Sequence, residues 1–173
     1  MRRTRRAWPM LAAMDVAELV AFLRESKLAV QASVAEAGPQ AAVIGFVASD
    51  AGELFFDTSS ASRKCQNLRR DPRIALVIGW DERTVQYEGL ADEPVGEELA
   101  HFKALYFERF PDGRDRERWP DIVYFRVRPS WARQSDFTGP EPMIRELSFR
   151  LPGSEHRESA PAGAETALRG SDG

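Results

Sequence analysis

The stretch FFDTSSASRKCQNLRRDP, residues 55–72, places a run of small hydroxyl residues directly before an arginine–lysine pair. Residues 62–70 of this stretch are predicted to form a short helix that follows a strand. Arg63 and Lys64 then lie in the first turn, where the helix dipole favours anions and disfavours cations. Because this arrangement weakens a solvent-exposed helix without visible compensation, we interpret it as a functional feature.

An anion bound at the start of this helix would resolve the conflict. Free backbone N–H groups, the cations Arg63 and Lys64, and nearby hydroxyl groups such as those of Thr58 and Ser62 would then converge on one phosphate. The alternative is a solvated basic turn without a ligand, and these residues alone leave both interpretations open.

The residues on both sides of the stretch predict a small β-domain. Apolar runs indicate six strands, over residues 28–34, 41–48, 53–57, 73–79, 84–92 and 121–129. Helical periodicity covers residues 15–26 and 94–110, and Asp15 and Glu18 have the spacing of a capping box. Gly89 predicts a bulge or a close backbone approach. Short connections make the strands mostly antiparallel, and closure into a barrel would best remove the sheet edges.

Alternation along residues 28–34 predicts a half-buried strand. Its more apolar positions are Leu28, Val30, Ala32 and Val34. They alternate with Ala29, Gln31 and Ser33, so the two sets occupy opposite faces.

The composition excludes several classes of protein. A chain of 173 residues with 43 % hydrophobic content can bury one core, but hardly two. The net charge of −3 gives no basic field for nucleic acid, and no apolar run approaches the ~20 residues of a membrane span. Cys65 is the single cysteine, and the two histidines, His101 and His156, cannot form a zinc site without carboxylates. We therefore expect no metal site and no nucleic-acid or membrane partner.

The chain divides into three predicted segments. Residues 1–14 form a flexible basic leader, because the apolar run after its four arginines is short and contains Pro9. Residues 15–138 form the domain, and residues 139–173 an extension with a disordered tail over residues 152–173. With no secretory signal and a single cysteine, the protein is expected to be cytoplasmic. Met10 and Met14 are alternative start sites.

The order of these features resembles the pyridoxamine 5′-phosphate oxidase-like, FMN-binding split-barrel family. The landmarks occur in the family's order and are Thr58, Ser62-Arg63-Lys64, Asp71-Pro72, Trp80 and Gly89. The similarity continues into RVRPSWARQSDF, residues 126–137, and covers residues 15–138. It implies a mainly β fold, a six-stranded antiparallel split β-barrel. It also implies a homodimer with FMN in clefts at the subunit interface.

The resemblance also implies a set of cofactor-binding residues. Those expected around the FMN phosphate are Thr58, Ser62, Arg63 and Lys64, with Asp57 beside them. Those expected at the isoalloxazine ring or the partner subunit are Val43, Ile44, Thr84, Gln86, Trp131 and Arg133. No catalytic acid or base is identified, because the flavin itself carries the hydride or electron chemistry.

Three departures from the family argue against pyridoxal phosphate synthesis. The strand over residues 41–48 lacks the basic residues that the true oxidases carry there, and Thr84 stands where they place a glutamine, with Gln86 two residues later. The sequence RLP at residues 150–152 is similar to their C-terminal motif, but it precedes a long tail and we treat it as coincidence. The resemblance therefore favours an FMN-dependent oxidoreductase with an unknown small-molecule substrate or electron donor.

Three alternatives stay open. They are a deazaflavin-dependent reductase on the same fold, a non-catalytic flavin-binding or redox-sensing module, and a dimeric structural domain with an empty cleft. Heme handling has weaker support, because neither histidine lies on a predicted strand.

Overall fold

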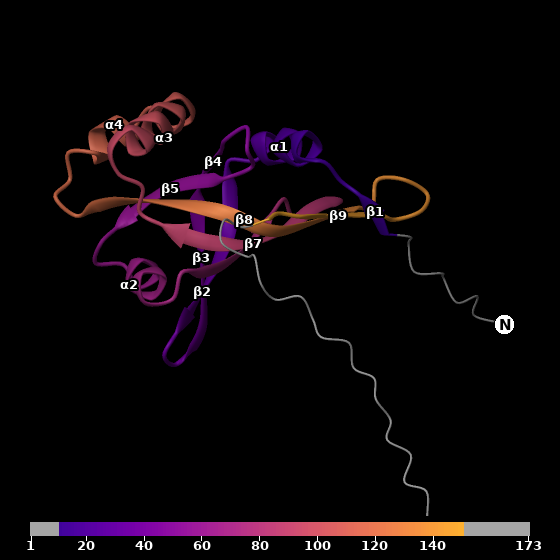
Figure 1. Cartoon of the computed structure of the whole chain (residues 1–173), viewed down its shortest axis with the longest axis horizontal. Coiled ribbons are helices and arrows are strands. Elements are labelled where there is room, and N and C mark those ends of the chain that lie inside the picture. Colours follow the sequence, from indigo (N-terminus) through magenta and orange to yellow (C-terminus); the bar gives the residue numbers. More distant parts are fainter. Residues whose placement is uncertain (1–10, 151–173) are drawn as a thin grey trace, which may run out of the picture.

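The computed structural model describes residues 11–150, in which nine strands form one curved sheet accompanied by four helices (Figure 1). The strands are β1 (Leu11–Ala13), β2 (Leu28–Ala35), β3 (Gly38–Gly45), β4 (Val47–Ala48), β5 (Leu54–Ser59), β6 (Arg73–Ile78), β7 (Arg83–Asp92), β8 (Ile122–Asp136) and β9 (Met143–Ser148). The helices are α1 (Val16–Glu25), α2 (Arg63–Arg70), α3 (Gly96–Arg109) and α4 (Gly113–Arg116).

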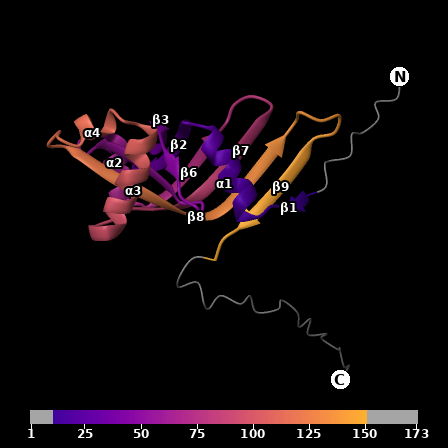
Figure 2. The same cartoon turned by 90° about the horizontal axis from the view of Figure 1, so that it is seen from above.

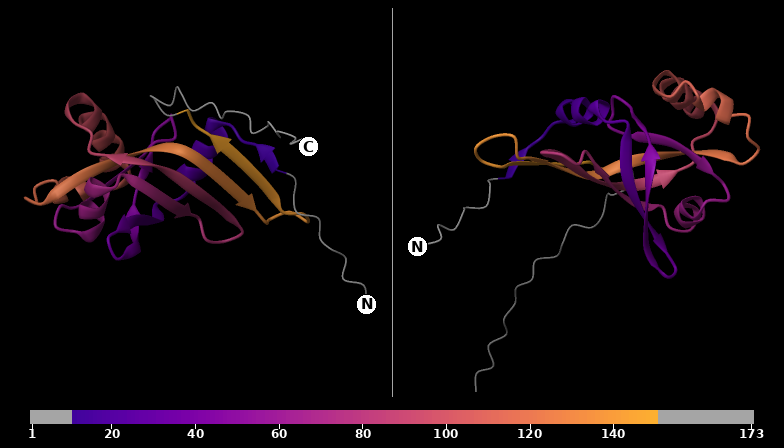
Figure 3. Two further views of the ribbon diagram at one scale, coloured as in Figure 1. Left: turned by 60° about the horizontal axis from the view of Figure 1, so that its bottom comes forward. Right: turned by 180° about the vertical axis from the view of Figure 1, so that it is seen from behind.

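The sheet is built around the long strand β8. The order is β1-β9-β8-β7-β6-β2-β3, with β5 paired to β8 and β4 paired to β5 outside this path. β8 curves through the molecule in both views of Figure 3, pairing with β5 along its first part and with β7 and β9 further on. β3 contacts β5 at the far side, yet no ladder joins these two strands in the described sheet. The barrel is therefore split and not closed.

The mainly β fold is confirmed, but the expected six antiparallel strands are an approximation. The strand expected over residues 41–48 divides into β3 and β4, and β1 and β9 were not predicted. The sheet is mixed, because β1 runs parallel to β9. Figure 2 shows β9 and β1 at the end of β8 opposite to α3 and α4. The sheet thus continues to Ser148, beyond the expected domain boundary at residue 138.

Helix α1 begins as its sequence predicts. Asp15 is the N-cap and accepts a hydrogen bond from the Glu18 amide at 2.8 Å, while Glu18 accepts one from the Asp15 amide at 3.2 Å. This capping box satisfies two amide donors that the helix itself leaves free. Leu19, Phe22 and Leu23 then pack into the core on one side of the helix. No helix within residues 11–150 is long and apolar enough to cross a membrane.

Strand β5 separates two apolar clusters. Phe56 faces the main core inside the curved sheet, whereas Phe55 faces an aromatic cluster beneath α3 and stacks on Phe102 at 5.2 Å and Tyr124 at 5.4 Å. Each fully buried side chain of this size contributes about 1.5–3 kcal/mol. Alternation along β5 thus places α3 and α4 on one side of the strand and α2 on the other (Figure 1).

The bulge predicted at Gly89 is present. The β7–β8 register shifts between Glu88 and Gly89. A Cβ atom at Gly89 would overlap the Arg128 carbonyl oxygen and lie 2.9 Å from Val127 Cγ1. Close backbone approach therefore requires glycine here.

Residues 1–10 of the flexible leader expected over residues 1–14 lie outside the described residues, as does the tail expected over residues 152–173. The rest of the expected leader is ordered in the sheet, because Leu11–Ala13 form β1 and Met14 is buried.

Candidate functional site

Helix α2 begins with a small hydroxyl network. Ser62 is the N-cap, and its Oγ accepts a hydrogen bond from the Cys65 amide at 3.2 Å. The Thr58 Oγ1 lies 3.1 Å from Ser62 Oγ and accepts a hydrogen bond from Lys64 Nζ at 3.4 Å. Within Arg63–Arg70 the first turn carries no acidic residue. The cations at the start of the helix are therefore uncompensated by a carboxylate in that turn.

Buried contacts fix α2 against the sheet. Cys65 and Leu68 are buried in the main core, and burial raises the pKa of the Cys65 thiol. Asn67 Nδ2 donates hydrogen bonds to Ser33 Oγ on β2 at 3.2 Å and to Gln40 Oε1 on β3 at 3.1 Å. The start of the helix is thereby held over the β2–β3 hairpin.

A cavity of about 310 Å³ lies where the start of α2 meets β2 and β3. Its lining residues are Gln31, Ser33, Gln40, Ala41, Ala42, Ser62, Arg63 and Lys64. Hydroxyl, guanidinium and ammonium donors therefore face one space, and the first amides of a helix add further donors. This donor set fits an anion, and a phosphate group in particular.

One buried polar atom in the cavity wall lacks a partner. The Gln31 side chain is 1 % exposed, and its Oε1 makes no hydrogen bond among residues 11–150. An unpaired buried acceptor costs about 1–3 kcal/mol, so native proteins rarely leave one unless a ligand or water pairs with it. Because that oxygen is itself buried, a ligand in the cavity does not contact it, and the groups that the cavity offers a ligand are the donors of Ser62, Arg63 and Lys64.

The pyridoxamine 5′-phosphate oxidase model matches residues 16–136, which contain this cavity and the whole of α2. The chain belongs to the pyridoxamine 5′-phosphate oxidase family. A search among curated proteins finds no match.

Solved structures with the same fold have diverse names. A heme binding protein from Mycobacterium smegmatis superposes with a TM-score of 0.67 at 20 % identity, covering 79 % of this chain and 59 % of that protein. The heme storage protein HutZ from Vibrio cholerae gives 0.58 at 24 % identity, covering 65 % and 87 %. General Stress Protein 26 from Bacillus anthracis gives 0.57 at 21 % identity, covering 70 % and 94 %. At these identities the similarity establishes the fold alone.

The structure brings together part of the predicted phosphate site. Ser62, Arg63 and Lys64 line the cavity. Thr58 is not part of the lining, but it contacts Ser62 and Lys64. Asp57 lies on the other face of β5, where its carboxylate accepts hydrogen bonds from Tyr106 Oη at 2.8 Å and Arg116 Nε at 2.9 Å. Asp57 is therefore engaged with the α3–α4 side of the strand, away from the cavity.

The residues expected around the flavin ring lie mostly on the outer face of the sheet. One cross-strand row contains Val43, Val30, Val77, Gln86 and Arg133 in register. Two further predicted residues, Thr84 and Trp131, lie two positions along β7 and β8 from this row, on the same face.

Neighbouring residues of β3 lie in different surroundings. Ala42 lines the cavity, the adjacent Val43 is 60 % exposed on the outer face, and Ile44 is buried in the core. Of the two ring residues expected on this strand, Val43 therefore lies on the outer face and Ile44 in the core, because neighbouring residues of a strand point to opposite faces.

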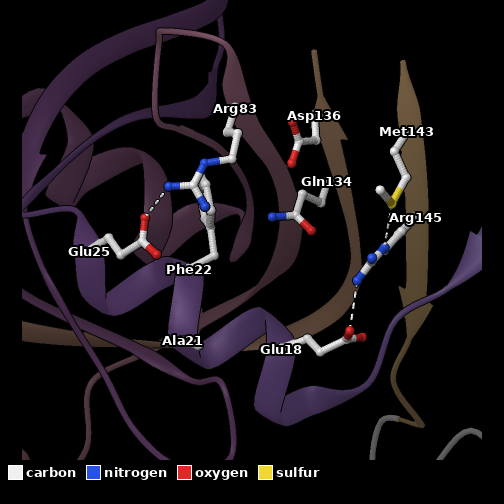
Figure 4. Close-up of a pocket in the computed structure, with 9 residues that line it drawn as sticks. All are labelled: Glu18, Ala21, Phe22, Glu25, Arg83, Gln134, Asp136, Met143 and Arg145. Atoms are coloured by element: carbon white, nitrogen blue, oxygen red, sulfur yellow. Dashed lines mark hydrogen bonds and ion pairs between the residues drawn. The ribbon is translucent and has the colours of Figure 1, made fainter. Parts of the chain in front are cut away.

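A second cavity, of about 270 Å³, lies between α1 and the ends of β7, β8 and β9 (Figure 4). Arg83 from β7 pairs with Glu25 at 2.6 Å, and Arg145 from β9 pairs with Glu18 at 2.7 Å. Both guanidinium groups already have carboxylate partners on α1, as Figure 4 shows. We interpret these pairs as contacts that hold α1 on the sheet.

Several cavity residues were missed from the sequence. Gln31, Ser33, Gln40 and Ala42 belong to strands on which only the apolar alternation was considered. A usable signal was present, because Gln31 and Ser33 occupy one face of a strand whose other face is apolar. A polar face on a strand of a small barrel faces either solvent or an internal ligand site.

Proposed function

We propose that the chain is an FMN-binding oxidoreductase whose phosphate site is the cavity at the start of α2. The observation that carries this proposal is the convergence of Ser62, Arg63 and Lys64 on one cavity. Membership of the pyridoxamine 5′-phosphate oxidase family supports a phosphorylated cofactor in this position. FMN, when bound, would supply the hydride or electron chemistry.

The chain's own residues would bind and orient the cofactor. Arg63 and Lys64 would neutralise the phosphate, and the amides at the start of α2 would donate to its oxygens. Thr58 would hold Lys64 in position through the hydrogen bond that is already present. The buried contacts of α2 would prevent the helix from moving when the ligand leaves.

We further propose a homodimer formed through the outer face of the sheet. The large apolar side chains exposed there are Leu28, Val34, Val43, Val77 and Leu90. Val30 lies between Val43 and Val77 in register, so these side chains form one apolar patch of the face, and exposed apolar patches are typical of protein–protein interfaces. Because Gln86 and Arg133 share the row of Val43 and Val77, this arrangement would place the predicted ring contacts at the subunit boundary.

The oligomeric state provides its own test. Light scattering should report a dimer for the wild-type chain and a monomer for Val77→Glu, since Val77 is 42 % exposed at the centre of this face. A wild-type chain that is monomeric at all concentrations would overturn the dimer proposal.

Two alternatives use the same cavity. A deazaflavin that carries a phosphate would need the same donors, and a flavin-binding module without catalysis would need no further residues. Heme binding, for which two of the neighbours are named, has less support. The one histidine within residues 11–150, His101, is exposed on α3 and packs against Phe102.

The deciding experiment measures FMN binding by quenching of flavin fluorescence in the purified full chain. Arg63→Ala with Lys64→Ala should weaken FMN affinity at least about a hundredfold, because a hydrogen bond to a charged group contributes about 1.5–3 kcal/mol. The matched control is Arg69→Ala with Arg118→Ala. It removes the same charge from two exposed residues that do not line the cavity.

Wild-type protein that binds no FMN would overturn the proposal, as would equal effects of the two double variants. If FMN binds, anaerobic addition of NADH or NADPH distinguishes the two flavin functions. Bleaching of the bound flavin supports the oxidoreductase, and a flavin that stays oxidised favours the binding module.

A further inference from the structure

The cavity between α1 and the ends of β7, β8 and β9 has a polar floor. Four residues of β8 and β9 form it on the inner face of the sheet, where Asp136 stands opposite Met143 and Gln134 stands opposite Arg145. A helix that packs on a sheet normally buries apolar side chains between the two. Phe22 of α1 supplies one such side chain here, whereas the strands supply charged and amide groups.

Arg145 keeps hydrogen-bond donors after it has paired with α1. Its Nη1 contacts Glu18 at 2.7 Å, while its Nε faces the thioether of Met143 at 3.0 Å. A thioether sulfur is a weak acceptor, so this N–H lacks a strong partner among residues 11–150. The ion pair therefore holds α1 on the sheet without satisfying the whole guanidinium group.

Asp136 supplies the unbalanced charge of the cavity. The two arginine–glutamate pairs are each neutral, whereas the Asp136 carboxylate forms no ion pair within the described part of the chain. Its Oδ1 accepts hydrogen bonds from the amide and the hydroxyl of Thr138, which lower the pKa of Asp136, and the nearby charges of Arg83 and Arg145 lower it further. The carboxylate is therefore ionised at neutral pH, and its Oδ2 lies outside these hydrogen bonds.

The register of β8 and β9 sets the spacing between these two charges. Asp136 and Arg145 are diagonal neighbours on one face of the ladder, so their Cβ atoms lie about 7 Å apart. They face the same space without pairing, and Figure 4 shows Gln134 and Asp136 between the two arginines. A molecule with an ammonium and a carboxylate on one carbon atom matches this arrangement, since Asp136 needs a cation and Arg145 an acceptor.

We propose that this cavity binds a free α-amino acid, with its ammonium on Asp136 and its carboxylate on Arg145 and the amide of Gln134. The cavity volume of about 270 Å³ is below the roughly 300–1,000 Å³ of sites for drug-sized ligands, so it suits a molecule of this size and not a nucleotide. Phe22 and Met143 would contact the side chain of the amino acid.

The site is separate from the proposed FMN site. The two cavities share no lining residue. Met143 and Arg145 also lie beyond residues 16–136, which the pyridoxamine 5′-phosphate oxidase model matches. The amino-acid site is therefore a feature that strand β9 adds to the family's fold.

The test measures binding of each common L-amino acid to the purified full chain by isothermal titration calorimetry. The tightest binder is then compared with two truncated forms of itself, the carboxylic acid without the α-amino group and the amine without the α-carboxylate. Asp136→Asn and Arg145→Gln each remove one partner, so a folding defect in one variant leaves the other interpretable. The matched control is Glu141→Gln, which removes a carboxylate from an exposed residue that does not line the cavity.

Both kinds of change should remove the same contacts. Each truncated ligand should bind the wild type at least about tenfold more weakly than the intact amino acid, and each variant should weaken the intact amino acid by a similar factor. The acid without the α-amino group should bind Asp136→Asn at least as tightly as it binds the wild type, because the contact is already absent. Glu141→Gln should bind the amino acid as the wild type does.

Wild-type protein that binds no amino acid would overturn the proposal, as would an amino acid that binds both folded variants as tightly as the wild type. Truncated ligands that bind as well as the intact amino acid would also overturn it, because Asp136 and Arg145 would then contribute nothing to affinity. None of these results bears on FMN binding, which is measured at the other cavity.

Discussion

Replacement of Ser62 by aspartate should change protein stability and ligand affinity in opposite directions. Ser62 caps α2 by accepting the Cys65 amide at 3.2 Å, and it also lines the cavity. Aspartate is as good an N-cap as serine, so the capping hydrogen bond is kept. Its charge would also compensate Arg63 and Lys64 and interact favourably with the helix dipole, so the free energy of unfolding should rise by about 0.3–1 kcal/mol.

The same carboxylate would repel a phosphate in the cavity. Two like unit charges about 4 Å apart, at an effective dielectric constant of about 20, repel by about 4 kcal/mol. Even half of this energy weakens binding roughly thirtyfold, since each 1.4 kcal/mol or so is a factor of about ten. The variant Ser62→Asn has the shape of Ser62→Asp and is also a good N-cap, but it carries no charge, so it should lose much less affinity for FMN.

Two assays on three proteins measure both effects. Urea unfolding of the ligand-free wild type, Ser62→Asp and Ser62→Asn gives the free energy of unfolding, and fluorescence quenching gives the dissociation constants of FMN and riboflavin. Riboflavin lacks the phosphate, so its affinity for Ser62→Asp should stay within about threefold of the value for Ser62→Asn.

The reasoning would be refuted if Ser62→Asp bound FMN as tightly as Ser62→Asn does. The start of α2 would then not be near the phosphate, and its basic first turn would be a solvated feature of the surface. Equal losses of FMN and riboflavin affinity would refute it too, because they would reflect a changed cavity shape and not charge.

Three further predictions concern the surrounding structure. Gly89→Ala should lower the free energy of unfolding by about 1–3 kcal/mol in urea, because its Cβ would overlap the carbonyl of β8. Asp71→Asn should make the free energy of unfolding depend less on pH in the acid range. Hydrogen bonds from Arg73 lower the pKa of Asp71 from 3.8 to about 2, so the contribution of Asp71 to stability is present above pH 3.8 and is lost as the pH falls toward 2. Asp57→Asn should cost about 1–3 kcal/mol of stability yet leave the FMN dissociation constant unchanged, and a large rise in that constant would place Asp57 in the site after all.

Local signals predicted the elements that position the site. The capping-box spacing at Asp15 and Glu18, the hydroxyl start of α2 and the break at Asp71-Pro72 each depend on neighbours within a few residues of the chain. Such interactions join residues that are close together in the sequence, so the sequence alone reveals them. The same holds for Gly89, where a glycine inside a strand pattern indicates a close backbone approach.

Long-range pairings could not be predicted in the same way. β9 is a short strand of mixed polarity, and it becomes a strand because β8 extends far enough to pair with it. Asp57 follows the ordinary two-residue alternation of a strand, so its place in the sequence does not reveal its partner. Its contact with Arg116 depends on where α4 packs. The cavity residues on β2 and β3 likewise belong to the site only because α2 packs across the hairpin, through Asn67.

Strand β2 reverses the usual distribution of polar and apolar residues, and this reversal connects the two halves of the proposed site. Its inward face carries Gln31 and Ser33, while its outward face carries Leu28, which is 47 % exposed, and Val34. A one-residue shift in register would bury the apolar set and expose the polar one, so the observed register opposes the hydrophobic effect on β2 taken alone. The ladders with β3 and β6 fix this register, and within the subunit it gives Ser33 a hydrogen bond from Asn67 but no apolar burial for Leu28 and Val34. A polar ligand inside the barrel and a second apolar surface outside it would make both faces favourable, which is why we expect cofactor binding and dimerisation to be coupled in this protein.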